Sequence, residues 1–129
     1  MLFWPYASGI ENSQQLSDWY SSSHFSHGVI FFFLVGSILT KLGRFKLVKG
    51  FIKDGGVRLA LLVSVCTEAL WEVMENSPII INRYRLTGLA AGYFGDSVIN
   101  SVSDTLFMVL GFYFAKKFGW KVSLVTVIF

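Results

Sequence analysis

The sequence predicts an all-α integral membrane bundle with three transmembrane helices and part of a fourth at the C-terminus. Of the 129 residues, 53% are hydrophobic and only 15% are charged, which is too apolar for an ordinary soluble domain of this length. Three apolar stretches, at about 24–42, 57–74 and 96–115, are each long enough to cross a bilayer. Turn signals and basic segments separate them, so residues 1–129 are expected to form a single membrane domain.

The first span follows a polar and aromatic segment at residues 1–23, which we expect to be a loop or a short interfacial helix. Residues 24–42 (HFSHGVIFFFLVGSILTKL) then provide a mostly apolar stretch of 19 residues. At a rise of about 1.5 Å per residue they cover a hydrocarbon core of about 30 Å. A basic hairpin over residues 43–56 follows and ends with the turn signal DGG.

The second span, at about 57–74, is expected to end before Pro78, because proline blocks the continuation of a helix. Residues 79–95 are predicted to form a loop with room for an apolar re-entrant or interfacial piece. The third span begins near Asp96 and is followed by a pair of lysines. The last residues (VSLVTVIF) are too few to cross a bilayer alone and are expected to begin a fourth helix.

Positive charge is concentrated in two places. Nine of the eleven basic residues lie in or beside the 43–56 hairpin or near the C-terminal end. The positive-inside rule predicts that both are cytoplasmic, and that the N-terminus and loop 76–95 face outward. The expected partner is the lipid bilayer. A nucleic-acid partner is not expected, because the basic residues bracket apolar spans instead of interleaving with polar ones on one face.

Acidic and histidine side chains collect in the outward half of the predicted spans. Glu68, Glu72 and Glu75 share one helix face at about 100° per residue. Glu68 and Asp104 each lie eight residues from the outward end of their span, which is a depth of about 12 Å. An unpaired charge at the centre of a bilayer costs about 2.5–3.5 kcal/mol, so these faces are predicted to turn toward one another.

Carboxylates that converge without cations must be protonated, share protons or bind a metal. Together with two histidines they suit zinc, manganese or iron. We therefore expect an outward-facing divalent metal site whose candidate ligands are His24, His27, Glu68, Glu72, Glu75, Asp96 and Asp104. If the protein is an enzyme, Glu68, Glu72 and Asp104 are its candidate catalytic residues. The expected reaction is then metal-assisted hydrolysis or transfer on a membrane-borne substrate.

A structural role for the same residues is the alternative. Glu75 and Asp96 lie near helix ends, where Asp96 would cap the third helix, and Arg83 and Arg85 would neutralise two carboxylates. The chain would then be a non-catalytic accessory subunit of a larger membrane complex, with polar faces that bind other subunits, lipids or a second copy. Whether it is an enzyme stays open, because the sequence contains no HExxH, CxxC or GxSxG motif.

Several strings also carry a family resemblance. Residues 11–20 read ENSQQLSDWY, residues 68–85 read EALWEVMENSPIIINRYR, and residues 93–112 read YFGDSVINSVSDTLFMVLGF. Across residues 11–115 the chain resembles the bacterial integral membrane proteins of uncharacterised protein family 0314, which has no established activity. The resemblance implies a bacterial-type inner-membrane location without supplying a reaction. Gln15 and Gly92 depart from the family pattern, which has a histidine and an aspartate there, and a family site that used these positions would be reduced here.

Overall fold

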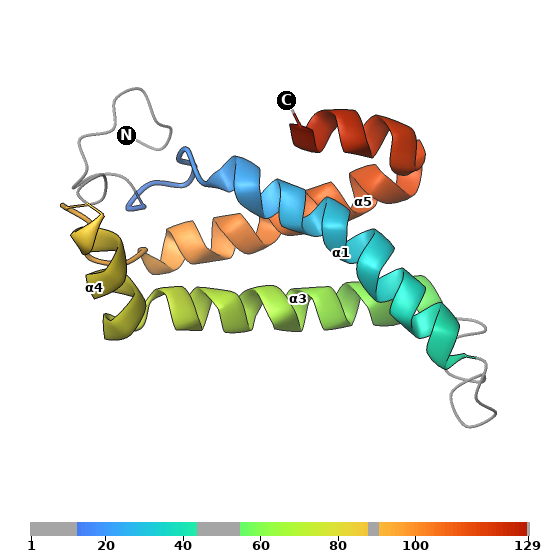
Figure 1. Ribbon diagram of the computed structural model, residues 1–129, viewed down its shortest axis with the longest axis horizontal. Coiled ribbons are helices and arrows are strands. Elements are labelled where there is room, and N and C mark those ends of the chain that lie inside the picture. Colours follow the sequence, from blue (N-terminus) through green and yellow to red (C-terminus); the bar gives the residue numbers. More distant parts are fainter. Residues whose placement is uncertain (1–12, 44–54, 88–90, 129) are drawn as a thin grey trace.

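The computed structural model describes residues 13–43, 55–87 and 91–128. The regular structure within these ranges is all helical: α1 (Ser21–Leu42), α3 (Gly56–Glu75), α4 (Pro78–Leu86) and α5 (Val98–Ile128). The three long helices pack on one another, and α4 contacts α3. Figure 1 shows that α1 crosses α5 and that α4 lies across the end of α3. The predicted all-α class is confirmed.

Successive long helices run in opposite directions. α1 ends and α3 begins at one end of the molecule, whereas α3 ends and α5 begins at the other, next to α4 (Figure 1). The backbone leaves the helical conformation at Gly119 (φ 74°, ψ −178°), and the helical segment beyond it turns back (Figure 1). The C-terminal residues therefore form a separate helical piece, as expected for the start of a further helix.

Two of the described helices, not the predicted three, are long and apolar enough to cross a membrane. They are α1 and the Val98–Val127 part of α5. α3 has 20 residues, which is sufficient length at about 1.5 Å per residue, but it carries Arg58 and three glutamates. These charges make α3 less apolar than the other two helices, which is why it differs from the prediction.

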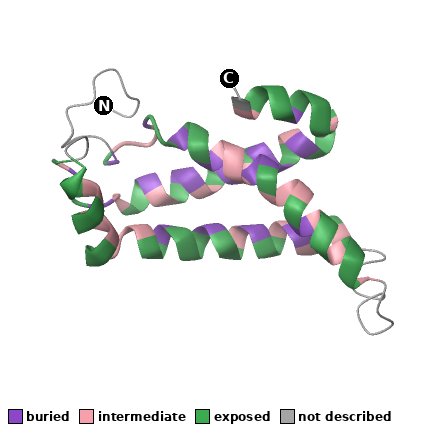
Figure 2. Cartoon of the chain, viewed as in Figure 1, coloured by how far each residue is buried: buried purple, intermediate pink, exposed green. Residues whose placement is uncertain are grey.

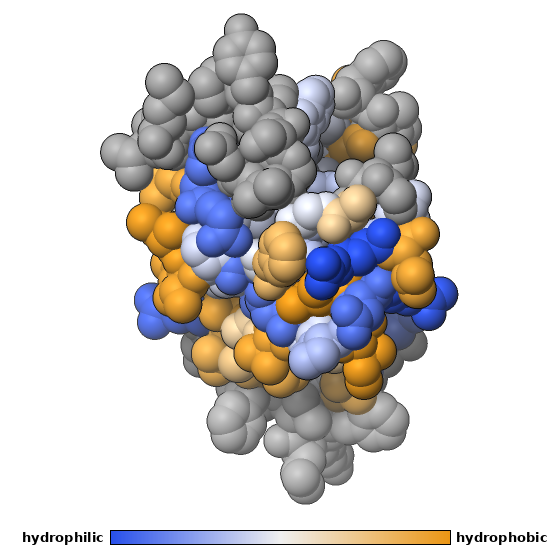
Figure 3. All heavy atoms as spheres, turned by 90° about the vertical axis from the view of Figure 1, so that its left-hand side faces the viewer, coloured by the Kyte–Doolittle hydropathy of each residue, from blue (hydrophilic) through white to orange (hydrophobic). Residues whose placement is uncertain are grey.

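The connection between α3 and α5 contains a helix, α4, where the sequence predicts a loop. α3 ends at Glu75, and Pro78 then occupies the first turn of α4, where its missing N–H is not needed. Arg83 and Arg85 on α4 are exposed, and the Arg85 guanidinium lies 4.6 Å from the centre of the Phe94 ring. Seen from this end, hydrophilic residues gather in the middle of the described surface between hydrophobic ones (Figure 3).

Much of the surface of each long helix is exposed, and the buried residues lie in stripes between exposed ones (Figure 2). The buried residues of α3 form a stripe at four-residue spacing that is small or acidic: Ala60, Ser64, Glu68 and Glu72. On the outer faces of the helices, large apolar side chains are exposed, such as Leu62 at 60%, Leu70 at 65% and Val73 at 72%. A buried stripe of small and acidic residues on a helix whose other face is apolar and exposed is typical of helices that face lipid.

The crossing of α1 and α5 depends on two glycines. A Cβ at Gly28 would overlap the carbonyl oxygen of Met108, and a Cβ at Gly111 would overlap the carbonyl oxygen of Phe25. The two backbones are therefore in direct contact, which small residues permit in membrane helices. Because the contact is reciprocal, each helix fixes the position of the other along its axis.

The interior of the bundle has an apolar half and a polar half. Val35, Ala60 and Phe112 form an apolar core, with Phe31, Phe32, Leu39 and Leu61 packed against it. The polar half lies toward α4, where α1 and α5 begin and α3 ends (Figure 1). Opposite chain directions thus bring the first turns of two helices beside the last turns of the third.

Candidate metal centre

The polar half brings six of the seven predicted ligands together around His24. His24 and His27 come from the first turns of α1, and the three glutamates come from the last turns of α3. Asp104 comes from the second turn of α5. The seventh predicted ligand, Asp96, lies before α5 and is held by a different set of contacts.

His24 is a buried imidazole surrounded by carboxylates. Its Nδ1 lies 2.5 Å from Oε1 of Glu68 and 3.4 Å from Oε1 of Glu72, and its Nε2 lies 3.7 Å from Oδ2 of Asp104. Nδ1 of His27 lies 3.2 Å from the same Glu68 oxygen. Glu68 is 0% exposed and His24 is 5% exposed, so these groups interact in an environment that screens charge poorly.

Several oxygens of the cluster are buried without a hydrogen-bond partner among the described residues. They are Oε2 of Glu68 and both carboxylate oxygens of Glu72. A buried polar atom left unpaired costs about 1–3 kcal/mol, and a charged one costs more. These oxygens retain acceptor capacity that the described part of the chain does not use.

Within the described ranges, no lysine or arginine forms an ion pair with a carboxylate; the ion pairs present all involve His24 or His27. Arg83 and Arg85, which the sequence offered as neutralising partners, are exposed on α4 instead. The structural alternative based on these arginines is therefore wrong for the described carboxylates.

Two sets of side chains bring their ligand atoms within reach of one ion: His24, His27 and Glu68, and His24, Glu72 and Glu75. The ligand atoms of each set all lie within 4.8 Å of one another. Atoms bound to a tetrahedral zinc ion lie about 2.0–2.2 Å from it and hence about 3.3 Å apart, close to the 3.2 Å between His27 and Glu68. The 2.5 Å contact of His24 with Glu68 is a direct hydrogen bond, so an ion would replace its proton.

Asp96 connects the ends of two helices instead of joining the cluster. Its carboxylate accepts hydrogen bonds from the Tyr93 hydroxyl (2.9 Å) and from Nδ2 of Asn76 (3.3 Å). Its own N–H donates to Oδ1 of Asn76 at 2.6 Å. The helix cap predicted for Asp96 is provided by Ser97, whose Oγ accepts the N–H of Asn100 at 3.2 Å.

The segment before α1 contributes residues that sequence reasoning missed. The Ser21 hydroxyl donates to Oδ1 of Asp104 at 2.9 Å. Oδ1 of Asp18 accepts the N–H groups of Tyr20 (2.8 Å) and Ser21 (3.1 Å), and Oδ2 of Asp18 accepts the Ser13 hydroxyl at 3.2 Å. This network positions Asp104 against His24. The sequence feature that could have predicted this network is the spacing of Asp18 and Ser21, which suits a turn closed by an aspartate side chain.

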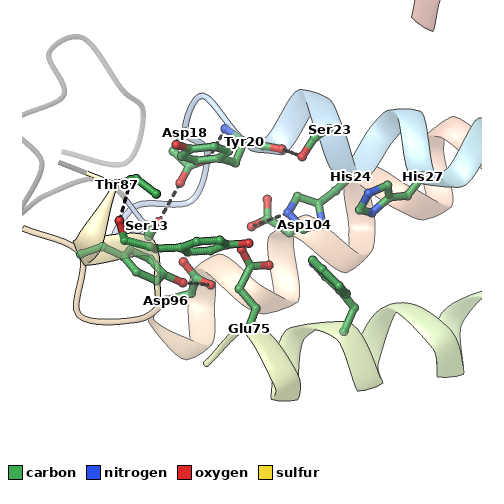
Figure 4. A pocket seen from close by; sticks show the side chains of 13 residues that line it. Ser13, Asp18, Tyr20, Ser23, His24, His27, Glu75, Thr87, Asp96 and Asp104 are labelled. Atoms are coloured by element: carbon green, nitrogen blue, oxygen red, sulfur yellow. Dashed lines mark hydrogen bonds and ion pairs between the residues drawn. The ribbon is translucent and has the colours of Figure 1, made fainter. Parts of the chain in front are cut away.

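A cavity of about 380 Å³ adjoins the cluster (Figure 4). His24, His27 and Asp104 are among the residues that line it. In Figure 4, Glu75 extends from α3 and Asp104 from α5 toward this space, and Asp96 lies nearer to α4. A small molecule in this cavity would therefore reach five of the seven candidate ligands: His24, His27, Glu75, Asp96 and Asp104.

Replacing Tyr93 with phenylalanine is expected to lower the free energy of unfolding by about 1–3 kcal/mol. Burial and the neighbouring Asp96 carboxylate raise the pKa of the Tyr93 hydroxyl, so it remains a donor to Asp96. Denaturant titration in detergent micelles measures the change. Tyr113→Phe, at a 47% exposed position, is the control and should change stability by less than about 0.5 kcal/mol. Equal losses in the two variants would contradict the assigned role of Tyr93.

Fold and site together define an all-α protein in which apolar helices enclose a buried histidine and carboxylate cluster. The chain belongs to the family DUF2585, described as a protein of unknown function, which matches residues 1–129. The predicted resemblance to uncharacterised protein family 0314 is confirmed by its relatives.

The chain is 46% identical over 113 residues to the UPF0314 protein of Sphingopyxis alaskensis. The aligned region covers 88% of this chain and 53% of the relative. It is 41% identical over 128 residues to the UPF0314 protein of Agrobacterium fabrum. Here the aligned region covers 99% of this chain and 58% of the relative. The chain thus spans somewhat more than half the length of these curated relatives. No solved structure matches it.

Proposed function

We propose that the chain is an integral membrane protein that binds a divalent transition metal in the polar half of its bundle. The observation that supports this best is the convergence of His24, His27 and Glu68 beside carboxylate oxygens that have no hydrogen-bond partner among the described residues. Two histidines and one carboxylate are the protein ligands of many zinc and non-haem iron sites. Glu72, Glu75 and Asp104 surround this set.

The buried polar stripe and the exposed apolar side chains of α3 support a location in the membrane. α1 and α5 are apolar over a sufficient length, and α3 packs against both with its polar stripe inward. We propose that α3 crosses the membrane with them. Its exposed face is largely apolar, and its acidic residues lie on the buried face. This orientation of α3 reconciles its charges with a hydrocarbon environment.

The distribution of basic residues supports an outward-facing site. Lys41 lies in the last turn of α1, and Lys116 and Lys117 lie just before the turn of α5 at Gly119. Both positions are at the end of the bundle away from the acidic cluster (Figure 1). With basic ends in the cytoplasm, the cluster would face the periplasmic side of an inner membrane.

The chemistry that best suits this arrangement is the activation of water for hydrolysis or transfer. Three protein ligands and one open position characterise catalytic zinc sites, and a divalent ion at such a position supplies water that loses a proton readily. Glu72, whose carboxylate lies within 4.8 Å of the ligand atoms of His24 and Glu75, would be the neighbouring general base if an ion were bound. The substrate would be membrane-borne, because the ends of the proposed spans form part of the cavity wall, at His27, Trp71 and Asp104.

Metal analysis of the purified full chain in detergent tests the proposal. We expect about one zinc, manganese or iron ion per chain, and a loss of affinity of about 100-fold or more in Glu68→Gln. Asp104→Asn, which alters a partner of the other His24 nitrogen, should lose about 10-fold.

Ser64→Ala is the matched control, because Ser64 lies one turn from Glu68 on the same buried stripe and its hydroxyl bonds only the carbonyl oxygen of Ala60, at 2.7 Å. This variant should retain the ion. A wild-type chain without a stoichiometric ion, or a Glu68→Gln variant that keeps it, would overturn the proposal.

A further inference from the structure

The cavity beside the cluster combines acidic and aromatic side chains. The acidic residues that line it are Asp18, Glu75, Asp96 and Asp104, and the tyrosines and tryptophan that line it are Tyr20, Trp71, Tyr84 and Tyr93. None of the described lysines or arginines lines it. A ligand that enters this space therefore meets negative charge and π-electron faces.

The charge asymmetry extends over the whole described chain. Of the eight acidic residues, Glu11 and Asp54 lie outside the described ranges, and the remaining six all lie in this cavity wall or in the cluster behind it. Arg83 and Arg85 lie on α4 at the same end, but they are exposed and do not line the cavity. His24 and His27 pair with Glu68, Glu72 and Asp104, whereas Asp18, Glu75 and Asp96 form no ion pair with a described residue.

The carboxyl groups in the wall of the cavity are positioned by local donors. Asp18 accepts two backbone N–H groups, and Asp96 accepts the Tyr93 hydroxyl. These hydrogen bonds fix where the two carboxyl groups lie beside the cavity.

A buried carboxylate also lies next to the cavity. Glu72 is 6% exposed, and its Oε1 lies 3.4 Å from Nδ1 of His24. Its carboxylate lies within 4.8 Å of the ligand atoms of His24 and Glu75, both of which line the cavity. An acceptor of this kind points to a positively charged ligand.

The aromatic side chains provide the other half of the recognition. The Tyr84 and Tyr93 rings lie with centroids 5.7 Å apart at an angle of 54°, and Trp71 lies edge-on to His27 at 6.4 Å. Aromatic faces arranged around a space attract organic cations through the ring quadrupole. A bare metal ion would not require them, and an anion would be repelled by the carboxylates.

We propose that this cavity binds the ammonium group of an organic cation. Its volume of about 380 Å³ falls in the range of small-molecule pockets, roughly 300–1,000 Å³. The ammonium group can come from the headgroup of a zwitterionic lipid or from a soluble amine, because both present the same chemistry. The inference goes beyond the metal site and does not require it, since the aromatic residues and Asp18 are not among the metal ligands.

The test is calorimetric titration of choline into the full chain held in phosphatidylglycerol nanodiscs, which contain no ammonium group. The neutral isostere 3,3-dimethylbutan-1-ol serves as the comparison ligand. We expect choline to bind about tenfold more tightly or better than the isostere, because the two differ in charge and not in shape. Equal binding of the two ligands, or no binding of choline, would overturn the inference.

Two substitutions assign the binding to the cavity. Trp71→Leu and Glu75→Gln are each expected to weaken choline binding by about tenfold. Trp120→Leu is the matched control, because Trp120 is 62% exposed and lies beyond Gly119, and it should stay within about twofold of wild type. Unchanged affinity in both cavity variants would also overturn the inference.

Repeating the titration in phosphatidylcholine nanodiscs distinguishes the two sources of the ligand. Competition by the lipid would lower choline affinity and identify a lipid headgroup, whereas unchanged affinity would identify a soluble amine. Metal content is measured on the same samples. Choline binding in a metal-free wild type would refute the metal proposal alone, and a metal-loaded wild type without choline binding would refute this inference alone.

Discussion

Gly28→Leu is expected to break the packing of α1 on α5 and to lower the free energy of unfolding by about 3 kcal/mol or more. Overpacking a well-filled interior costs about 1–3 kcal/mol when side chains can adjust. At Gly28 the obstacle is the backbone of Met108 and Phe112, which cannot move aside without shifting the helix. We therefore expect an effect at or above the top of that range, measured by denaturant titration in micelles.

Gly36→Leu is the matched control for this prediction. Gly36 lies two turns further along α1, and a Cβ there would meet no atom within 4 Å. The substitution should change stability by less than about 1 kcal/mol, because glycine to leucine also improves helix propensity. Similar losses in the two variants would show that the backbone contact at Gly28 is not what holds α1 to α5.

His24→Leu is expected to be the second strongly destabilising change, with a loss of about 3–5 kcal/mol. Removing one partner of a buried ion pair leaves the other charges without compensation. Here the imidazole separates Glu68, Glu72 and Asp104, and each of them lies within 4.0 Å of one of its nitrogens. The same denaturant titration, performed on metal-free protein, measures the loss.

Two comparisons show whether charge is the cause. His27→Leu should cost less, because the His27 side chain is 32% exposed and contacts only Glu68 among the carboxylates, at 3.2 Å. The double variant His24→Leu with Glu68→Leu should recover part of the loss, since replacing both members of a buried pair with apolar residues is often neutral. A double variant that is less stable than His24→Leu alone would indicate a packing defect.

Much of the fold was predictable because helices and their faces are set by local periodicity. The i, i+4 spacing places Glu68 and Glu72 on one face whatever surrounds the helix, and the structure buries both. The apolar stretches identified α1 and α3 within three residues of their observed bounds, and the start of α5 within two, but the predicted third span ends well before Ile128, where α5 ends. The sequence does not predict α4, because Pro78 indicates the end of the preceding helix and gives no separate sign that it also begins the next one. Proline suits the first turn of a helix equally well.

Residues within one helix face were therefore assigned correctly as neighbours, but contacts between distant segments were not resolved. Asp104 joins the cluster and Asp96 does not, because the loop before α5 places Asp96 against Asn76 and Tyr93. Ser21 and Asp18 entered the site through the path of the chain before α1, which no periodicity describes.

By itself, the sequence determined that this is a helical and strongly apolar protein, and which acidic and histidine residues lie near one end of its spans. These properties depend on composition and on spacing along one helix. Only the tertiary structure decided that His24 meets Glu68, Glu72 and Asp104 and that a cavity adjoins them. The physical reason is that these contacts depend on how far α1 is displaced along α5. The backbone contacts at Gly28 and Gly111 set that displacement between residues about 80 positions apart in the chain.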